Sequence, residues 1–190
     1  MKYGDDMKDT EIRSAKLTDA AAIRKIYGWY IENTAITFEY TVPTEREFAT
    51  RMASILTRYP YLVAEKDGKL LGYAYAAPYI TRRACDWSCE VSIYLAREAT
   101  GQGLGRALYA ALEQQLRQMG IVNMYASIAC ADGEDPYVSN NSLDFHAHMG
   151  FRPVGSFRNC GYKFGRWYHL TWVEKTIGEH APNMKEVKFL

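Results

Sequence analysis

The clearest hydrophobic pattern in the chain is a strict alternation over residues 85–95. Apolar side chains occupy every odd-numbered position, whereas the even-numbered positions hold Asp86, Ser88, Glu90, Ser92 and Tyr94. Successive side chains of a β-strand point to opposite faces of its sheet. The segment is therefore predicted to be a strand with one buried and one polar face, and the polar face carries two carboxylates.

Helical periodicity predicts four further elements, in which apolar residues recur every three or four positions. They are a helix opened by Thr18 and Asp19, one capped by Thr44, one running from Leu104 to a C-cap at Gly120, and a short one capped by Asn141 or Ser142. Thr44 followed three residues later by Glu47 is typical of a capping box.

The remaining apolar runs complete a mixed α/β fold. Two of them flank Lys66-Asp67-Gly68, which predicts a β-hairpin. The predicted strands cover residues 11–16, 61–65, 69–77, 85–95, 121–129, 151–160 and 166–176. The order β-α-α-β-β-β-α-β-α-β-β indicates an α/β fold with a mixed sheet. We expect a single domain over residues 11–176, with terminal tails at 1–10 and 177–190.

Composition and charge exclude several classes of protein. A chain of 190 residues with 48% hydrophobic and 24% charged residues is typical of one globular domain. The net charge of +1, with no basic run longer than Arg82-Arg83, argues against nucleic-acid binding. The apolar stretch 70–81 is too short to span a membrane, and the charged start predicts no signal peptide. The four cysteines lack zinc-site spacing, so we expect no metal and a cytoplasmic protein with free thiols.

Three glycines stand at alternate positions, 101, 103 and 105, between the alternating strand and a helix. Glycine lets the backbone approach a ligand and adopt positive φ, and the first amides of a helix have no internal partner. Together with the helix dipole they form a site for a phosphate or pyrophosphate. Arg106 stands where a Walker A loop needs Lys and a dinucleotide fingerprint needs Gly. The alternative is a turn that only packs the helix on the sheet.

An ordered set of motifs resembles one enzyme family over nearly the whole of residues 11–176. The motifs are Tyr59–Glu65, Asp86–Glu90, Thr100–Gly105, Phe145–Phe151 and Gly161–Trp167. This set is similar to the GNAT superfamily of N-acetyltransferases, and within it to the phosphinothricin and methionine-sulfoximine acetyltransferase branch. Thr100 departs from the Arg or Gln that begins the family's glycine loop. The resemblance implies the GNAT fold, acetyl-CoA as co-substrate and a homodimer.

The resemblance also implies roles for particular residues. Glu90 would be the general base, and His146 would donate a proton to the leaving thiolate. Arg82 would bind a substrate carboxylate and Phe38 would wall the substrate site. The implied coenzyme contacts are Ile93, Tyr94, Leu95, Gly101, Gln102, Gly103, Leu104, Gly105, Arg106 and Asn141.

Each implied role has an alternative that follows from the residue alone. Glu90 fits a solvated sheet face, because most strand carboxylates are surface groups. His146 fits a helix face packed on the sheet, and Arg82 fits a solvated loop. Phe38 fits the core, and Asn141 fits a helix cap.

The implied reaction is direct transfer of an acetyl group to the primary amine of a small amino acid or analogue. Amide formation requires a base for the ammonium proton and fixed donors for the thioester carbonyl. Acetylation of a polyamine or a protein N-terminus is an alternative within the same fold. A non-catalytic coenzyme A-binding module is another, and Arg106 disfavours an NAD-dependent oxidoreductase.

Overall fold

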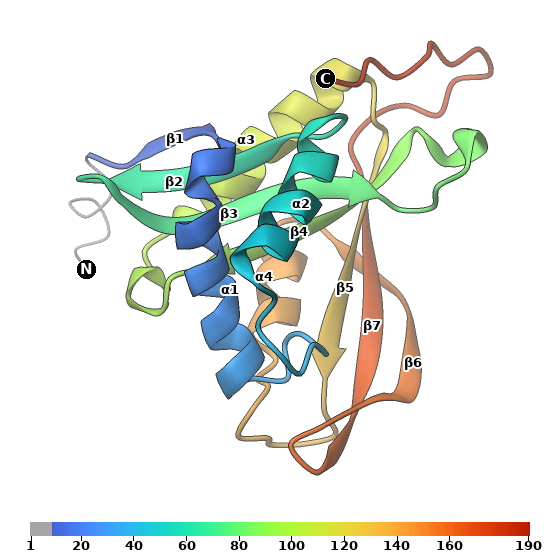
Figure 1. Ribbon diagram of the computed structural model, residues 1–190. Coiled ribbons are helices and arrows are strands. Elements are labelled where there is room, and N and C mark those ends of the chain that lie inside the picture. The colour runs from blue at the N-terminus through green and yellow to red at the C-terminus, as the bar shows by residue number, and fades with distance from the viewer. Residues whose placement is uncertain (1–8) are drawn as a thin grey trace.

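A seven-stranded mixed sheet organises the molecule, which a computed structural model describes over residues 9–190 (Figure 1). The strand order is β1-β2-β3-β4-β5-β7-β6. The strands are β1 Glu11–Ser14, β2 Tyr61–Lys66, β3 Lys69–Pro78, β4 Ser88–Leu95, β5 Asn123–Cys130, β6 Arg152–Lys163 and β7 Arg166–Thr176. The helices are α1 Ala20–Asn33, α2 Glu45–Leu56, α3 Leu104–Met119 and α4 Asn141–His148. The predicted element order and the mixed α/β class are confirmed.

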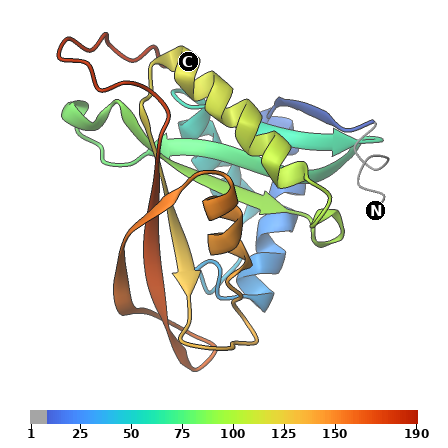
Figure 2. The same ribbon diagram turned by 180° about the vertical axis from the view of Figure 1, so that it is seen from behind.

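The helices cover opposite faces of the sheet. Helices α1 and α2 lie in front of it in Figure 1, and α3 and α4 lie on the other side, as Figure 2 shows. Leu108, Leu112 and Leu116 of α3 are fully buried against the sheet. On the other face Ile23 and Met52 pack on a layer of sheet tyrosines. No helix within residues 9–190 has the length and apolar character needed to cross a bilayer.

The structure contains the predicted capping box, hairpin turn and helix C-cap. The Thr44 hydroxyl accepts from the Glu47 amide at 3.3 Å, and the Glu47 carboxylate accepts from the Thr44 amide at 2.8 Å. Asp67 and Gly68 adopt φ of 51° and 75°, which closes the predicted hairpin. Gly120 ends α3 with a φ of 91°. These elements are determined by neighbouring residues and follow directly from the sequence.

The alternating strand is shorter than predicted, because β4 begins at Ser88 and not at residue 85. Arg83–Cys85 form a 3-10 turn in which the Asp86 amide donates to the Arg83 carbonyl at 3.1 Å. Asp86 therefore lies outside the strand and pairs with Arg58 at 3.4 Å. The predicted sharing of one strand face by Asp86 and Glu90 is wrong.

The start of α4 also differs from the prediction. Its N-cap is Asn140, and no side chain makes a capping hydrogen bond there. The cap predicted at Asn141 or Ser142 is wrong, because both residues already lie within the first helical turn.

The segment 177–190, predicted as a tail, packs along the end of α3 (Figure 2). The Lys188 amide donates to the Met119 carbonyl at 2.8 Å, and the Trp87 indole donates to the Lys185 carbonyl at 2.8 Å. The Phe189 ring meets Tyr59 edge-on, with centroids 5.3 Å apart. Of the other tail, predicted at 1–10, residues 1–8 lie outside the described residues.

Candidate active site

Strands β4 and β5 separate in the middle of the sheet. They pair in parallel only over Ser88–Glu90 and Asn123–Tyr125. Beyond this point β4 continues beside β3 and β5 continues beside β7, so the two strands diverge (Figure 2). Backbone groups that face such an opening have no strand partner and are available to a ligand.

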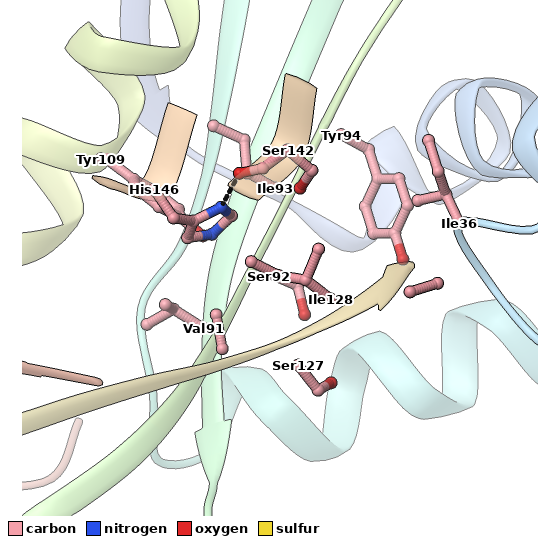
Figure 3. A pocket seen from close by; sticks show the side chains of 12 residues that line it. Ile36, Val91, Ser92, Ile93, Tyr94, Tyr109, Ser127, Ile128, Ser142 and His146 are labelled. Carbon is pink, nitrogen blue, oxygen red and sulfur yellow. Dashed lines mark hydrogen bonds between the residues drawn. The ribbon is translucent and has the colours of Figure 1, made fainter. Parts of the chain in front are cut away.

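A cavity lies at this opening, and residues of several elements line it (Figure 3). Its lining comprises Val91–Tyr94 of β4, Ala126–Ala129 of β5, Tyr109 of α3, Ser142 and His146 of α4, and Ile36 from the segment after α1. The cavity therefore joins the polar face of the predicted strand to the short helix that carries His146.

Glu90 is the last residue of β4 that pairs with β5, immediately before these two strands separate. Its carboxylate accepts a hydrogen bond of 2.8 Å from the hydroxyl of Ser127, which lines the cavity. Burial raises the pKa of Glu90, and the Ser127 hydrogen bond partly opposes this shift. A partly buried carboxylate held by one neutral donor differs from the solvated alternative and suits a base.

The His146 ring is buried and bonded at both nitrogens. Nδ1 donates to the Ser142 carbonyl at 2.7 Å, because a carbonyl can only accept. Nε2 lies 3.0 Å from the Tyr109 hydroxyl and accepts a hydrogen bond from it when the ring is neutral. Burial lowers the pKa of His146, which favours the neutral ring. This geometry favours the packed alternative, and proton donation to a leaving thiolate stays a prediction.

The glycine loop combines conformational and packing roles. Gly101 and Gly103 adopt φ of 75° and 82°, and Gly103 is the N-cap of α3. Gly105 lies inside the helix, where a Cβ atom would meet the Phe145 ring at 3.2 Å. No side chain among residues 9–190 caps α3, so its first amides are open to an anion. The first two glycines fit the anion site, and the third fits the packing alternative.

The end of β4 contributes both backbone and core contacts. Ile93 and Tyr94 line the cavity, whereas the Leu95 carbonyl accepts from the Tyr30 hydroxyl at 2.8 Å. The register between β3 and β4 is continuous through Gly72 and Leu95. The opening beside Ile93 and Tyr94 therefore arises because β5 pairs with β4 no further than Glu90.

Five other predicted residues do not line the cavity. Arg82 and Arg106 are exposed, and Asn141 is an exposed residue at the start of α4. Gln102 donates from its side chain to the Glu98 carbonyl at 2.8 Å. Phe38 packs on Tyr168, with ring centroids 6.5 Å apart.

Two residues of the site were missed from the sequence. Ser127 shares a strand face with Tyr125, the register partner of Glu90, so strand alternation could have identified it. Tyr109 is a buried helix residue whose hydroxyl bonds to His146, and periodicity alone marks it as core.

Comparison with known proteins places this geometry in a family. The GNAT acetyltransferase domain model matches residues 12–172. The phosphinothricin N-acetyltransferase of Alcaligenes faecalis is 35% identical over 176 residues, covering 92% of this chain and 86% of that protein. The L-methionine sulfoximine/L-methionine sulfone acetyltransferase of Salmonella typhimurium is 33% identical over 171 residues, which cover 90% of this chain and 96% of that protein.

A solved structure shows the same likeness in three dimensions. The phosphinothricin acetyltransferase of Sinorhizobium meliloti in complex with acetyl-CoA is 34% identical and superposes with a TM-score of 0.83. The match covers 93% of this chain and 94% of that one. The chain therefore belongs to the GNAT family of acetyltransferases.

Proposed function

We propose that this protein acetylates the primary amine of a small amino acid or analogue of the phosphinothricin or methionine sulfoximine type. Family membership makes it an acetyl-CoA-dependent N-acetyltransferase. The names of its relatives support the acceptor class. The observation that carries the proposal is the Glu90–Ser127 pair at the point where β4 and β5 separate.

The chain's own groups fit a coenzyme with a pyrophosphate and an extended arm. The uncapped amides from Leu104 to Arg106 suit the pyrophosphate, beside the loop at Gly101–Gly103. The edge of β4 from Ile93 to Leu95 that has no β5 partner suits the amide-bearing arm, and we keep Asn141 as a proposed contact. When bound, the coenzyme supplies an acetyl thioester as the electrophile.

Glu90 is the proposed base, acting directly or through a water molecule. The acceptor amine carries an extra proton near neutral pH and must lose it before it can attack a carbonyl. A carboxylate whose pKa is raised by burial holds that proton more readily than an exposed one. The Ser127 hydroxyl fixes one carboxylate oxygen, and we propose that the other faces the acceptor.

Arg82 and Phe38 are the proposed acceptor contacts. Arg83 pairs with Glu186 at 2.5 Å, whereas Arg82 has no ion pair within residues 9–190. A guanidinium without a carboxylate partner can bind an α-carboxylate through two parallel hydrogen bonds.

The acceptor class can be tested by thiol release from acetyl-CoA with a panel of amines. We expect turnover with phosphinothricin, methionine sulfoximine or methionine sulfone, and much slower turnover with spermidine or a peptide N-terminus. Faster turnover with either of the latter would move the protein to the alternative acceptor classes. Binding of acetyl-CoA by calorimetry without turnover on any amine would indicate a non-catalytic module.

We also propose a homodimer, on the basis of one exposed strand. β6 lies at the edge of the sheet, and apolar side chains are exposed on it and on β7, with Phe157 62% and Trp167 60% exposed. An unpaired edge that carries apolar groups is a pairing surface. Sedimentation equilibrium should give twice the chain mass for the wild type and the monomer mass for Phe157→Lys. A monomeric wild type would contradict the dimer.

A further inference from the structure

The segment 34–40, between α1 and α2, forms one wall of the site without regular secondary structure. Its Ile36 lines the cavity on the side away from His146 and Tyr109 (Figure 3). The Ala35 amide donates to the Tyr137 carbonyl at 2.9 Å, and the Tyr40 hydroxyl donates to the Tyr162 carbonyl. The segment is therefore held by contacts to distant parts of the chain.

Lys163, the last residue of β6, makes two buried contacts with this segment. Its side chain is buried, with 2% of the residue exposed. Its ammonium donates to the Thr34 carbonyl at 2.9 Å and to the Thr37 carbonyl at 2.8 Å. No carboxylate within residues 9–190 forms an ion pair with it. Because a buried ammonium must be hydrogen-bonded, two backbone carbonyls take the place that a carboxylate usually has.

The two accepting carbonyls bracket the residue that lines the cavity. Thr34 and Thr37 lie on either side of Ile36, so one ammonium fixes the backbone at both ends of this short stretch. A carbonyl in an irregular segment has no helix or strand partner of its own, and leaving it unpaired inside the protein is costly. Phe38 packs against Gly161, two residues before Lys163 on β6, where a Cβ atom would meet the Phe38 ring at 2.5 Å.

We propose that Lys163 is a positioning residue for acetyl transfer, which holds segment 34–40 as the acceptor-side wall of the cavity. It acts through Ile36 and Phe38 and does not touch the reacting atoms. The expected effect of Lys163 on acetyl transfer rests on the proposed function. The effect of Lys163 on the backbone of segment 34–40 can be measured without any turnover.

The test compares Lys163→Met with Lys175→Met. Methionine keeps most of the side-chain volume and removes the three donors. Lys175 is a matched control, because its side chain is also largely buried but donates to Glu113 at 2.6 Å on α3. Hydrogen–deuterium exchange would report on segment 34–40, steady-state kinetics on the acceptor KM, and calorimetry on the Kd of acetyl-CoA.

For Lys163→Met we expect exchange within segment 34–40 to rise about tenfold, and the acceptor KM to rise about tenfold, because small misplacements of a site wall have large kinetic effects. The Kd of acetyl-CoA should stay within about twofold of the wild type, because the anion site lies on α3. Lys175→Met should leave both the exchange and the acceptor KM unchanged. Lys163→Arg keeps the charge and the donors, and should restore part of the loss of protection.

Unchanged exchange in segment 34–40 of Lys163→Met would overturn the inference. So would an equal rise of the acceptor KM in Lys163→Met and Lys175→Met, because that result indicates general destabilisation. If the Met variant does not fold, Lys163→Gln takes its place, because Gln has no charge and a side chain one bond shorter than that of Lys. Wild-type exchange and a wild-type acceptor KM in Lys163→Gln would overturn the role. Absence of wild-type turnover with every amine would refute the proposed function, while the exchange measurement still decides the role of Lys163.

Discussion

Replacing Glu90 with Gln should lower kcat/KM for the acceptor by about 10²–10⁴-fold, the usual contribution of a general base. Gln keeps the shape of the side chain and can still bond to Ser127, but it cannot accept the ammonium proton. The KM for acetyl-CoA should stay close to the wild-type value, because the proposed anion site on α3 is unaffected. Thiol release measured from acidic to alkaline pH checks the effect, and the acidic limb of the wild-type profile should be absent from the variant.

Two further variants separate proton transfer from a structural effect. Glu174 lies in the same row of the sheet as Glu90 but pairs with Arg152 at 3.0 Å, so Glu174→Gln should retain wild-type activity. The Ser127 bond lowers the pKa of Glu90, so Ser127→Ala should raise that pKa. Because the base works deprotonated, the acidic limb should then move to higher pH. Wild-type rates for Glu90→Gln at every pH, or a shift to lower pH in Ser127→Ala, would contradict the assignment.

Removing residues 179–190 should lower the free energy of unfolding by about 3 kcal/mol, because two apolar side chains no longer pack on the core and bury surface there. Val187 and Phe189 pack on the main core, and the Arg58 guanidinium lies 3.9 Å from the centroid of the Phe189 ring. For a chain of this length the loss corresponds to a fall in Tm of roughly 6–12 °C. Thermal unfolding followed by circular dichroism measures it.

The exposed contact in the same segment provides the control. Arg83 and Glu186 form a surface ion pair, and such pairs contribute little to stability. Glu186→Ala should therefore leave the Tm within about 2 °C of the wild type. A truncated protein that unfolds at the wild-type temperature would show that the packed segment adds nothing to the stability of the domain.

The elements predicted most accurately have strong signals among neighbouring residues. The capping box at Thr44, the hairpin turn at Asp67 and the C-cap at Gly120 depend only on residues close in the chain, so local sequence is sufficient to predict them. The alternation extends β4 too far toward its N-terminus, because the pattern continues through residues 85–87. There the chain bends into a 3-10 turn, and the Trp87 carbonyl accepts from the Val122 and Asn123 amides.

The sequence by itself determined the order of elements, the glycine-rich start of α3 and the position of Glu90 on a polar strand face. Each follows from backbone geometry over a few neighbouring residues. Only the tertiary structure decided that Ser127 holds Glu90, that Tyr109 faces His146, and that Lys163 anchors a segment more than a hundred residues away. These partners depend on where β4 and β5 part and on how helices and loops pack across the sheet, and no local periodicity encodes which side chains then meet.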